Sequence, residues 1–200
     1  KFSKKMNLDT LYSLFLQSTG VSTDTRKIDP GNLFFALKGP SFNANEFAST
    51  ALEMGASAVV VDEAAFAVAG DSRYFLCEDV LGTLQALATF HRRKFSIPFI
   101  GLTGSNGKTT SKELLHSVLK QKFNTLATIG NLNNHIGLPL SLLELRSQPE
   151  IAVVELGMNH PGEIFSPARL LDEVWDYPSD AGSPDLVRVH IKNLRERVPN

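Results

Sequence analysis

One ten-residue segment restricts the possible folds of this chain more than any other feature. Residues 101–110 are Gly-Leu-Thr-Gly-Ser-Asn-Gly-Lys-Thr-Thr. They follow an apolar run at 96–100 and precede residues 111–119, whose Leu and Val side chains recur at helical spacing. A strand, a glycine-rich turn and a helix in this order suit phosphate binding, because backbone N–H groups approach the phosphates and the helix N-terminus favours their charge. The segment predicts nucleotide binding; the alternative is an ordinary strand–helix turn.

Residues of this loop suit different parts of a nucleoside triphosphate. Lys108 is expected to reach the terminal phosphates, and the Thr109 hydroxyl to bind a magnesium ion. Position 102 is Leu, where the usual pattern has Gly. The residues predicted to bind ATP are Gly104, Ser105, Asn106, Gly107, Lys108, Thr109 and Thr110.

Composition excludes several kinds of protein. The 20 basic and 21 acidic residues nearly cancel, so the chain has no overall electrostatic footprint for nucleic acid or membrane. Cys77 is the one cysteine, which excludes an internal disulfide and fits a reducing cytoplasm. No apolar stretch approaches the ~20 residues of a membrane span, and the N-terminus has no signal-peptide pattern. We expect a cytoplasmic monomer without membrane partners.

Strand and helix patterns alternate along the first 164 residues, which indicates an α/β fold. Residues 1–95 are predicted to form an α/β substrate module, and 96–164 a truncated parallel-sheet module with the phosphate loop. Residues 165–200 are predicted to form a helical tail, because two Ser-Pro pairs open helices there. The expected strands are 33–37, 58–61, 74–77, 96–100, 123–128 and 151–155, and the expected helices of the two modules are 8–20, 46–54, 80–94, 111–119 and 137–145.

A carboxylate follows the last of these strands. Glu155 ends the apolar run Ile-Ala-Val-Val, and ligands of parallel sheets collect at the carboxyl ends of the strands. A carboxylate there can bind magnesium that also bridges phosphate oxygens. The alternative is a strand-end Glu that faces water. Because the phosphate loop is present, we favour the metal role.

Three further polar segments are candidates for ligand contacts. Residues 131–135 contain four amide or imidazole groups, which suit a substrate-facing loop or a self-bonded Asn turn. His160 lies in the loop after Glu155, where it either contacts phosphate or metal or is merely exposed. Segments 22–26 and 38–47 combine hydroxyls, an Arg and a Gly-Pro turn, and suit either a phosphorylated or sugar ligand or a capped surface turn.

Together these motifs resemble the amino-terminal part of Mur ligases of the MurF type. The resemblance covers residues 1–164. The phosphate loop is common to all Mur ligases and to folylpolyglutamate synthases, whereas Asn-Asn-x-x-Gly-x-Pro and Asn-His-Pro-Gly-Glu point to the MurF type. The matching segments are Ser-Thr-Asp-Thr-Arg at 22–26, Leu-Phe-Phe-Ala-Leu-Lys-Gly at 33–39, Gly-Ala at 55–56, the phosphate loop at 103–110, 131–139 and 155–164.

The resemblance implies an ATP-dependent ligase of peptidoglycan precursor synthesis. ATP would phosphorylate the carboxylate of a UDP-N-acetylmuramoyl tripeptide, and the amine of D-Ala-D-Ala would attack the acyl phosphate. Lys108, Glu155 and His160 would be catalytic, and Thr109 and Glu155 would hold Mg²⁺. The residues that would bind the UDP-sugar peptide are Ser22, Thr23, Asp24, Arg26, Lys38, Asn43, Asn45, Asn133 and Asn134.

Beyond Ile164 the ligase pattern stops. The tail is similar to the last two helices of winged-helix DNA-binding domains of the OmpR/PhoB type, through Leu-Leu-x-x-Val-Trp at 170–175 and Val-x-Val-His-Ile-x-x-Leu-Arg at 187–195. Asp185 stands where an Arg is common in that family. The alternative is an amphipathic helix pair that only packs its apolar side chains. The residues that would face DNA are His190, Lys192, Asn193 and Arg195.

A chain that begins at Lys1 and changes pattern near residue 164 is expected to be an incomplete or chimeric form. We expect binding of a UDP-muramoyl peptide and weak binding of MgATP, without ligase turnover. Two other functions stay open. One is a DNA-binding regulator that uses the ligase-like part as a sensor, and the other is a different phosphate-loop enzyme such as a small kinase.

Overall fold

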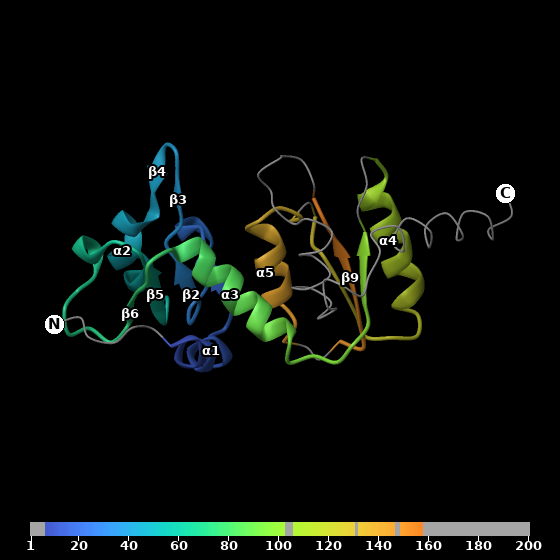
Figure 1. Cartoon of the computed structure of the whole chain (residues 1–200), viewed down its shortest axis with the longest axis horizontal. Coiled ribbons are helices and arrows are strands. Elements are labelled where there is room, and N and C mark those ends of the chain that lie inside the picture. Colours follow the sequence, from blue (N-terminus) through green and yellow to red (C-terminus); the bar gives the residue numbers. More distant parts are fainter. Residues whose placement is uncertain (1–6, 103–105, 131, 147–148, 158–200) are drawn as a thin grey trace, which may run out of the picture.

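Two parallel β-sheets form the framework of the molecule, and a long helix runs from one to the other (Figure 1). The computed structural model describes residues 7–102, 106–130, 132–146 and 149–157. Helices cover the sheets, so the α/β class expected from the sequence is confirmed.

The strand order is β1-β2-β5-β6 in the first sheet and β7-β9-β8 in the second, and β3 and β4 form an antiparallel hairpin. The strands are β1 (Val21–Ser22), β2 (Leu33–Phe35), β3 (Lys38–Gly39), β4 (Phe42–Asn43), β5 (Ala58–Val61), β6 (Tyr74–Leu76), β7 (Phe99–Leu102), β8 (Thr125–Ala127) and β9 (Ile151–Glu155). The helices are α1 (Leu8–Gln17), α2 (Ala48–Glu53), α3 (Val80–Arg92), α4 (Lys108–Leu119) and α5 (Gly137–Leu143), with 3₁₀ turns at Thr25–Lys27, Ala44–Phe47 and Ala64–Phe66.

The first sheet is covered on both faces, which explains why its central strands are continuous apolar runs. Successive side chains of a strand point to opposite faces. Phe34 and Val59 accordingly pack with α2, whereas Leu33 and Phe35 pack with α1 and α3 on the other face. Helix α2 and the pair α1 and α3 therefore enclose the sheet.

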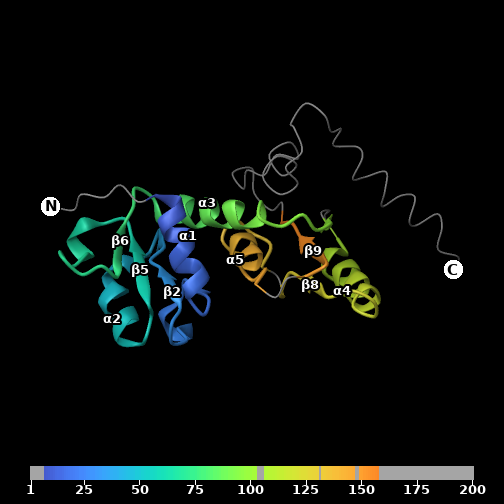
Figure 2. The same cartoon turned by 90° about the horizontal axis from the view of Figure 1, so that it is seen from below.

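Helix α3 connects the two halves through a shared core. One hydrophobic cluster extends from Phe15 of α1 through Leu84 and Leu87 of α3 to Leu142 of α5. Figure 2 shows α1 and α5 side by side along α3. Helix α3 begins at an Asp79 cap, whose Oδ1 accepts a hydrogen bond from the Leu81 N–H at 3.0 Å. The two sheets are thus attached to opposite ends of one helix.

Arg146, which follows α5, forms a second link. Its guanidinium donates hydrogen bonds to the carbonyl oxygens of Phe15 and Ser18, at the end of α1. The guanidinium carbon also lies 4.1 Å from the centre of the Phe15 ring. Carbonyls at a helix C-terminus lack intrahelical partners, and a cation there also interacts favourably with the helix dipole. The second module therefore supplies the cap of a helix in the first.

Most expected elements are present, with shifts at their ends. The strand expected at 96–100 is β7, Phe99–Leu102, which pairs with β9 along its whole length. The helix expected at 46–54 begins as a 3₁₀ turn that is capped by the Asn43 side chain. The two-residue strands β1, β3 and β4 were not expected, because such short segments have no periodicity to detect. The helices expected in 165–200 lie outside the described residues.

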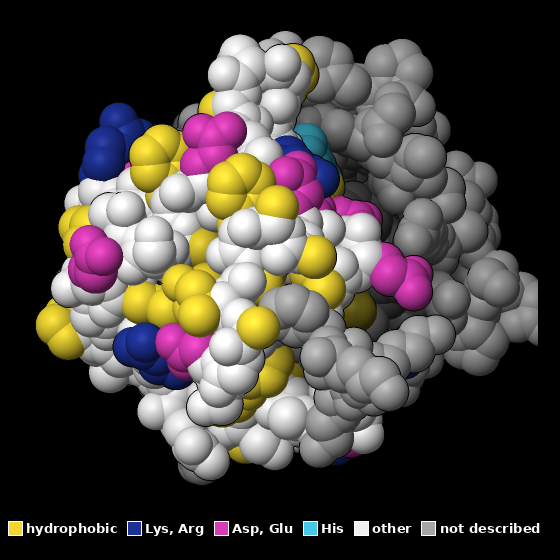
Figure 3. Space-filling view, turned by 90° about the vertical axis from the view of Figure 1, so that its left-hand side faces the viewer, with side chains coloured by type: hydrophobic (Ala, Val, Ile, Leu, Met, Phe, Trp, Pro, Cys, Tyr) yellow, Lys and Arg dark blue, Asp and Glu magenta, His cyan; other side chains and the backbone are white. Residues whose placement is uncertain are grey.

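The surface adds two observations. In the described part of the chain, no helix has both the length and the apolar character needed to cross a membrane. On the described part of the face in Figure 3, hydrophobic side chains form several groups, and acidic and basic side chains lie among and around them. That face therefore shows no extended surface of one charge.

His91 lies where α1 and α3 meet, and it is 2% exposed. Its Nδ1 is 3.1 Å from the Tyr12 hydroxyl, and its ring stands edge-on to the rings of Phe15 and Phe95. Burial, together with the nearby charge of Arg146, lowers the pKa of His91 from 6.5 to about 4. The folded protein therefore holds this histidine neutral.

This pKa predicts a loss of stability in mild acid. Between pH 6.5 and 4 the unfolded chain binds more protons than the folded one. The free energy of unfolding should therefore decrease as the pH is lowered from 6.5 to 4, by up to about 3 kcal/mol. Asp24 and Asp71, whose pKa values are lowered from 3.8 to about 2, lose their stabilising contribution mainly below pH 4. Urea unfolding at a series of pH values from 7 to 4 measures how steeply the free energy of unfolding depends on pH. His91→Gln should flatten this dependence, and an equal slope in both proteins would contradict the prediction.

Candidate active site

The phosphate-loop residues that the structure describes lie at the start of α4. Gly107 is the N-cap residue, and its φ of 78° lies in the left-handed region that favours glycine. Lys108 and Thr109 occupy the first turn of α4, where backbone N–H groups have no intrahelical acceptor. Asn106 and Thr110 flank them, whereas Gly104 and Ser105 lie outside the described residues. This is the arrangement that an anion requires at a helix N-terminus.

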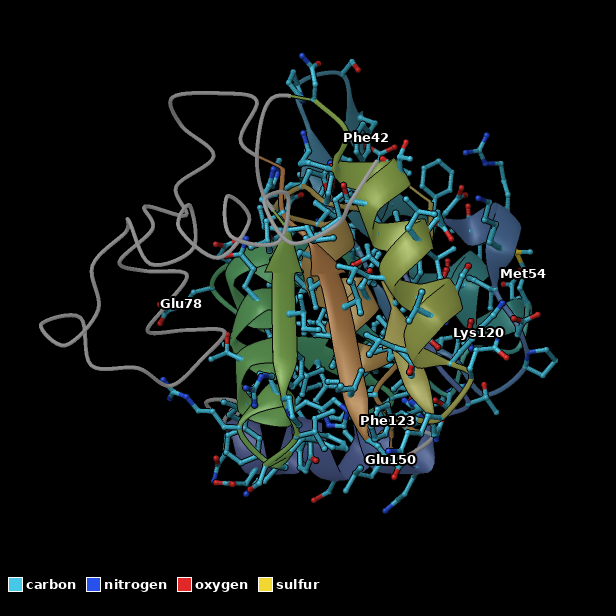
Figure 4. The ribbon with its side chains drawn as sticks, turned by 90° about the vertical axis from the view of Figure 1, so that its right-hand side faces the viewer. Phe42, Met54, Glu78, Lys120, Phe123 and Glu150 are labelled. Carbon is cyan, nitrogen blue, oxygen red and sulfur yellow. The ribbon has the colours of Figure 1, made fainter. Side chains whose placement is uncertain are left out.

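Glu155 lies at the carboxyl end of β9, the central strand of the second sheet. The register pairs it with Leu102, the last residue of β7 before the phosphate loop. Figure 4 shows β7 and β9 side by side, with their carboxyl ends at the edge where α4 begins. Glu155 is 1% exposed, so it does not face water as the simpler alternative supposed.

Three residues distant in sequence converge on this carboxylate. The Thr109 hydroxyl donates to Glu155 Oε1 at 3.3 Å, and Asn133 Nδ2 donates to the same oxygen at 2.8 Å. The other oxygen, Oε2, is buried without a hydrogen-bond partner, and the Nζ of Lys112 lies 4.0 Å from it. The site thus combines a hydroxyl, an amide and a carboxylate behind the N-terminus of a helix.

The donor set fits a magnesium ion. Mg²⁺ prefers hard oxygen ligands and usually keeps water and substrate phosphates in its shell, so one or two protein oxygens suffice. Thr109 Oγ1 and the Glu155 carboxylate provide such oxygens, and Oε2 accepts no hydrogen bond. Among the described residues no group of three His, Cys, Asp or Glu side chains gathers.

The polar segment 131–139 serves two purposes. The Asn134 side chain accepts hydrogen bonds from the N–H groups of Ile136 and Gly137, at 3.1 and 2.7 Å, and so stabilises the entry to α5. For the Asn134 oxygen, the self-bonded turn is therefore the correct description. Asn133 instead points to Glu155, and its carbonyl accepts from the Gly157 N–H at 2.7 Å. A β-carbon at Gly157 would lie 2.7 Å from that carbonyl oxygen, so the contact requires glycine.

A second polar cluster lies at the carboxyl edge of the first sheet. Lys38 Nζ is 3.1 Å from Asp62 Oδ1 and 3.3 Å from Glu63 Oε1. Asn43 Nδ2 donates to both carboxylate oxygens of Glu63 at 3.2 Å. The structure thus brings together Lys38 and Asn43, which the sequence predicted, with two acidic residues that it missed.

Asn45 is the buried centre of this cluster, with 0% exposure. Its Nδ2 donates to Asp62 Oδ1 at 2.9 Å, and its Oδ1 accepts from the Asp62 N–H at 3.0 Å. Burial raises the pKa of Asp62, but the hydrogen bonds from Asn45 and Lys38 outweigh it and lower the pKa below its usual value. Asp62 and Glu63 follow the apolar run of β5 just as Glu155 follows the apolar run Ile151–Val154 in β9, and this shared signal could have identified them.

The segment Ser22–Arg26 satisfies its polar groups internally. Ser22 Oγ donates to the carbonyls of Asp24 and Lys27 at 3.0 and 3.2 Å. The Asp24 carboxylate caps the turn through the Arg26 N–H and also binds the Arg26 guanidinium at 2.8 Å. Thr23 lies in the same turn. The segment therefore forms a capped turn, and its contact with a phosphorylated or sugar ligand stays a prediction.

Figure 1 shows hairpin β3–β4 and the beginning of α4 on the same side of the molecule. The polar cluster of the first sheet and the carboxylate of the second thus lie toward one side. His160 and the four residues expected to face DNA, His190, Lys192, Asn193 and Arg195, lie outside the described residues.

Family comparisons agree with this geometry. Residues 17–89 match the model for the Mur ligase family, catalytic domain, and residues 102–171 match the Mur ligase middle domain. Residues 144–200 match the model for the C-terminal part of transcriptional regulatory proteins, so two models overlap over 144–171. The part of the chain before residue 144 is thus similar to the amino-terminal and middle domains of Mur ligases.

Individual relatives narrow this class. The chain is 39% identical over 178 residues to the UDP-N-acetylmuramoyl-tripeptide–D-alanyl-D-alanine ligase of Bacillus subtilis, covering 89% of this chain and 38% of that protein. It is 44% identical over 144 residues to the Escherichia coli ligase of the same name, covering 72% of this chain and 31% of that protein. The amino-terminal part is therefore MurF-like. The chain spans less than two fifths of the length of these two relatives.

Solved structures lead to the same conclusion. A MurF structure from Acinetobacter baumannii matches with a TM-score of 0.70 and 31% identity, covering 86% of this chain and 39% of that one. The MurF ligase of Thermotoga maritima in complex with ADP matches with a TM-score of 0.67 and 35% identity, covering 79% of this chain and 35% of that one. The expected α/β fold with parallel sheets is borne out, and it is similar to that of MurF structures.

The two substrate segments should differ in their effect on stability. We expect Asn45→Ala to lower the free energy of unfolding by about 1–3 kcal/mol, because the Asp62 N–H loses its acceptor and the Asp62 carboxylate loses a donor. Arg26→Ala should change it little, because the Asp24–Arg26 pair is solvated. Urea unfolding of both variants at pH 7 tests the contrast. Equal losses of free energy of unfolding would contradict the prediction, because the buried cluster would then stabilise the fold no more than the Asp24–Arg26 pair does.

Proposed function

We propose that this chain provides the substrate-binding and phosphate-binding parts of a MurF-type ligase. Residues 1–95 would bind the UDP-N-acetylmuramoyl tripeptide, and residues 96–164 would bind ATP with Mg²⁺. The observation that carries the proposal is the convergence of Thr109 and Asn133 on the buried Glu155 carboxylate, directly behind the start of α4. The likeness to MurF ligases, one of them in complex with ADP, supports the same assignment.

The phosphate-binding residues would act mainly by position and charge. The backbone N–H groups at the start of α4 and the Lys108 ammonium would hold the β- and γ-phosphates and stabilise the charge of the transferring group. Thr109 and Glu155 would hold Mg²⁺, which when bound neutralises charge on the phosphate oxygens. Asn133 would keep the Glu155 carboxylate oriented through its hydrogen bond to Oε1.

In a complete ligase of this type the reaction would proceed in two transfers. A carboxylate oxygen of the tripeptide attacks the γ-phosphorus of ATP, the bond to the bridging oxygen breaks, and ADP leaves with that electron pair. The amine of D-Ala-D-Ala then attacks the acyl carbon, inorganic phosphate leaves, and the nitrogen loses a proton. His160 stays a candidate residue for lining the cleft near the reacting groups. The absence of turnover expected from the sequence also stays a prediction.

The first sheet would contribute the nucleotide-sugar site. Lys38 and Asn43 lie on the hairpin that follows β2, and the buried Asn45 fixes the Asp62 backbone and carboxylate behind them. The Lys38 ammonium and the Asn43 amide of this cluster would donate hydrogen bonds to a phosphorylated sugar at this edge of the sheet. Its two carboxylates would orient these donors, as the contacts to Glu63 show for Asn43.

Removal of the loop lysine tests the nucleotide part of the proposal. We expect Lys108→Ala to weaken binding of ADP in the presence of Mg²⁺ by at least about tenfold, because a charge-assisted contact to phosphate contributes about 1.5–3 kcal/mol. Isothermal titration calorimetry of the full chain measures its affinity for ADP. Lys120→Ala, at the other end of α4, is the matched control and should bind like the unmodified chain. Equal affinity of Lys108→Ala and the control would contradict the proposal.

A second candidate function follows from the match of residues 144–200 to the regulator family. In that case the chain would bind duplex DNA through Lys192 and Arg195. Binding should weaken steeply with salt and should be lost in the double variant Lys192→Ala plus Arg195→Ala. Fluorescence anisotropy with labelled duplex at two salt concentrations measures it. A flat curve for the unmodified chain would exclude this function.

A further inference from the structure

Helix α4 buries a cation where a helix packed on a sheet usually buries apolar side chains. Lys112 is the one residue of α4 that is buried, and its exposure is 0%. Leu114 and Val118 of the same helix are 63% and 70% exposed. Helix α4 contacts all three strands of the second sheet, so the charged side chain occupies a position that packing alone would give to Leu.

The ammonium group of Lys112 has a complete set of partners. Its Nζ donates to the carbonyl oxygens of Thr128 and Gly130, at 2.7 and 2.9 Å, and lies 3.1 Å from Glu113 Oε1. Its three N–H donors thus match three oxygens. Two of these oxygens belong to the chain that leaves β8, so Lys112 ties that segment to α4.

The same segment also contacts Glu155. The Glu155 N–H donates to Thr128 Oγ1 at 2.9 Å, while Lys112 binds the carbonyl of that threonine. Glu155 Oε2, which lacks a hydrogen bond, faces the Lys112 ammonium at 4.0 Å. Lys112 is therefore both the nearby opposite charge of the buried carboxylate and the anchor of the strand end beside it.

We propose that Lys112 is a positioning residue for the metal-binding carboxylate. Its charge balances Glu155, and its hydrogen bonds fix residues 128–130. Glu155 Oε1 is thereby held against Thr109 and Asn133. Because a buried ion pair is a weak source of net stability, site geometry explains its presence better than fold stability does. The role toward Mg²⁺ rests on the proposed function, whereas the pairing of the two charges does not.

The pairing is tested without any ligand. Lys112→Met leaves the Glu155 carboxylate buried and unbalanced, and should lower the melting temperature by roughly 6 °C or more. Adding Glu155→Gln removes the unbalanced charge, so the double variant should lose clearly less than the sum of the single losses. Lys120→Met removes the same charge from the exposed end of α4 and should change little (Figure 4). Additive losses would overturn the pairing.

Lys112→Met alone could fail to fold. Recovery of a folded state on adding Glu155→Gln would then support the pairing, and failure to recover would overturn it.

The positioning role is tested by the coupling between metal and nucleotide. ADP affinity of the full chain is measured by calorimetry with excess EDTA and with Mg²⁺, and the ratio of the two dissociation constants gives the enhancement by Mg²⁺. We expect the single variant Lys112→Met to show an enhancement by Mg²⁺ that is at least about tenfold smaller, while its affinity for ADP in EDTA is unchanged. Lys112→Arg should restore part of it. A purely structural role would weaken both affinities together and leave their ratio unchanged.

These results separate the two proposals. If the unmodified chain does not bind ADP, the proposed function fails, while the melting experiment still decides the charge pairing. If the unmodified chain shows the Mg²⁺ enhancement and Lys112→Met keeps it in full, the inference about Lys112 fails and the proposed function stands.

Discussion

The second half of the structure depends on the burial of one carboxylate, at the end of the central strand of the second sheet. Glu155 is ionisable and almost fully buried, so the surrounding chain must supply donors and positive charge. Thr109 and Asn133 provide the donors, and Lys112 the charge. These residues come from α4 and the loop before α5. One buried side chain thereby fixes the arrangement of the helix, the loop and the strand, and it does so at the edge where an anion meets a helix N-terminus.

The sequence predicted most of this framework and part of the site. Continuous apolar runs such as 58–61 and 151–154 indicated buried strands, because strands covered on both faces have that pattern. Glu155 was found for the same reason, as a carboxylate at the end of such a run. Asp62 and Glu63 have an equal signal after β5, but their contacts with Lys38 and Asn43 join segments about 20 residues apart, which only the folded sheet brings together.

Other features were beyond sequence reasoning for physical reasons. Lys112 has the pattern of a solvent-exposed helical lysine, and its burial depends on carbonyls of residues 128 and 130 that only the tertiary fold brings near. Arg146 likewise caps a helix more than a hundred residues earlier in the chain. Asn134 and Asp24 show the converse case, in which a polar side chain of ligand-binding type completes a local turn. Composition alone does not distinguish these uses.

The shared core around α3 has a consequence for how the protein folds. Phe15 and Leu84 belong to the same cluster as Leu142 and Val154, so neither sheet has a hydrophobic core of its own on that side. The two modules should consequently melt in one cooperative transition, although each resembles a separate unit in sequence. Cutting the chain between α3 and β7 would expose the face of α3 that α5 covers and leave the end of α1 without its Arg146 cap. The modules are thus separable as patterns but not as folding units.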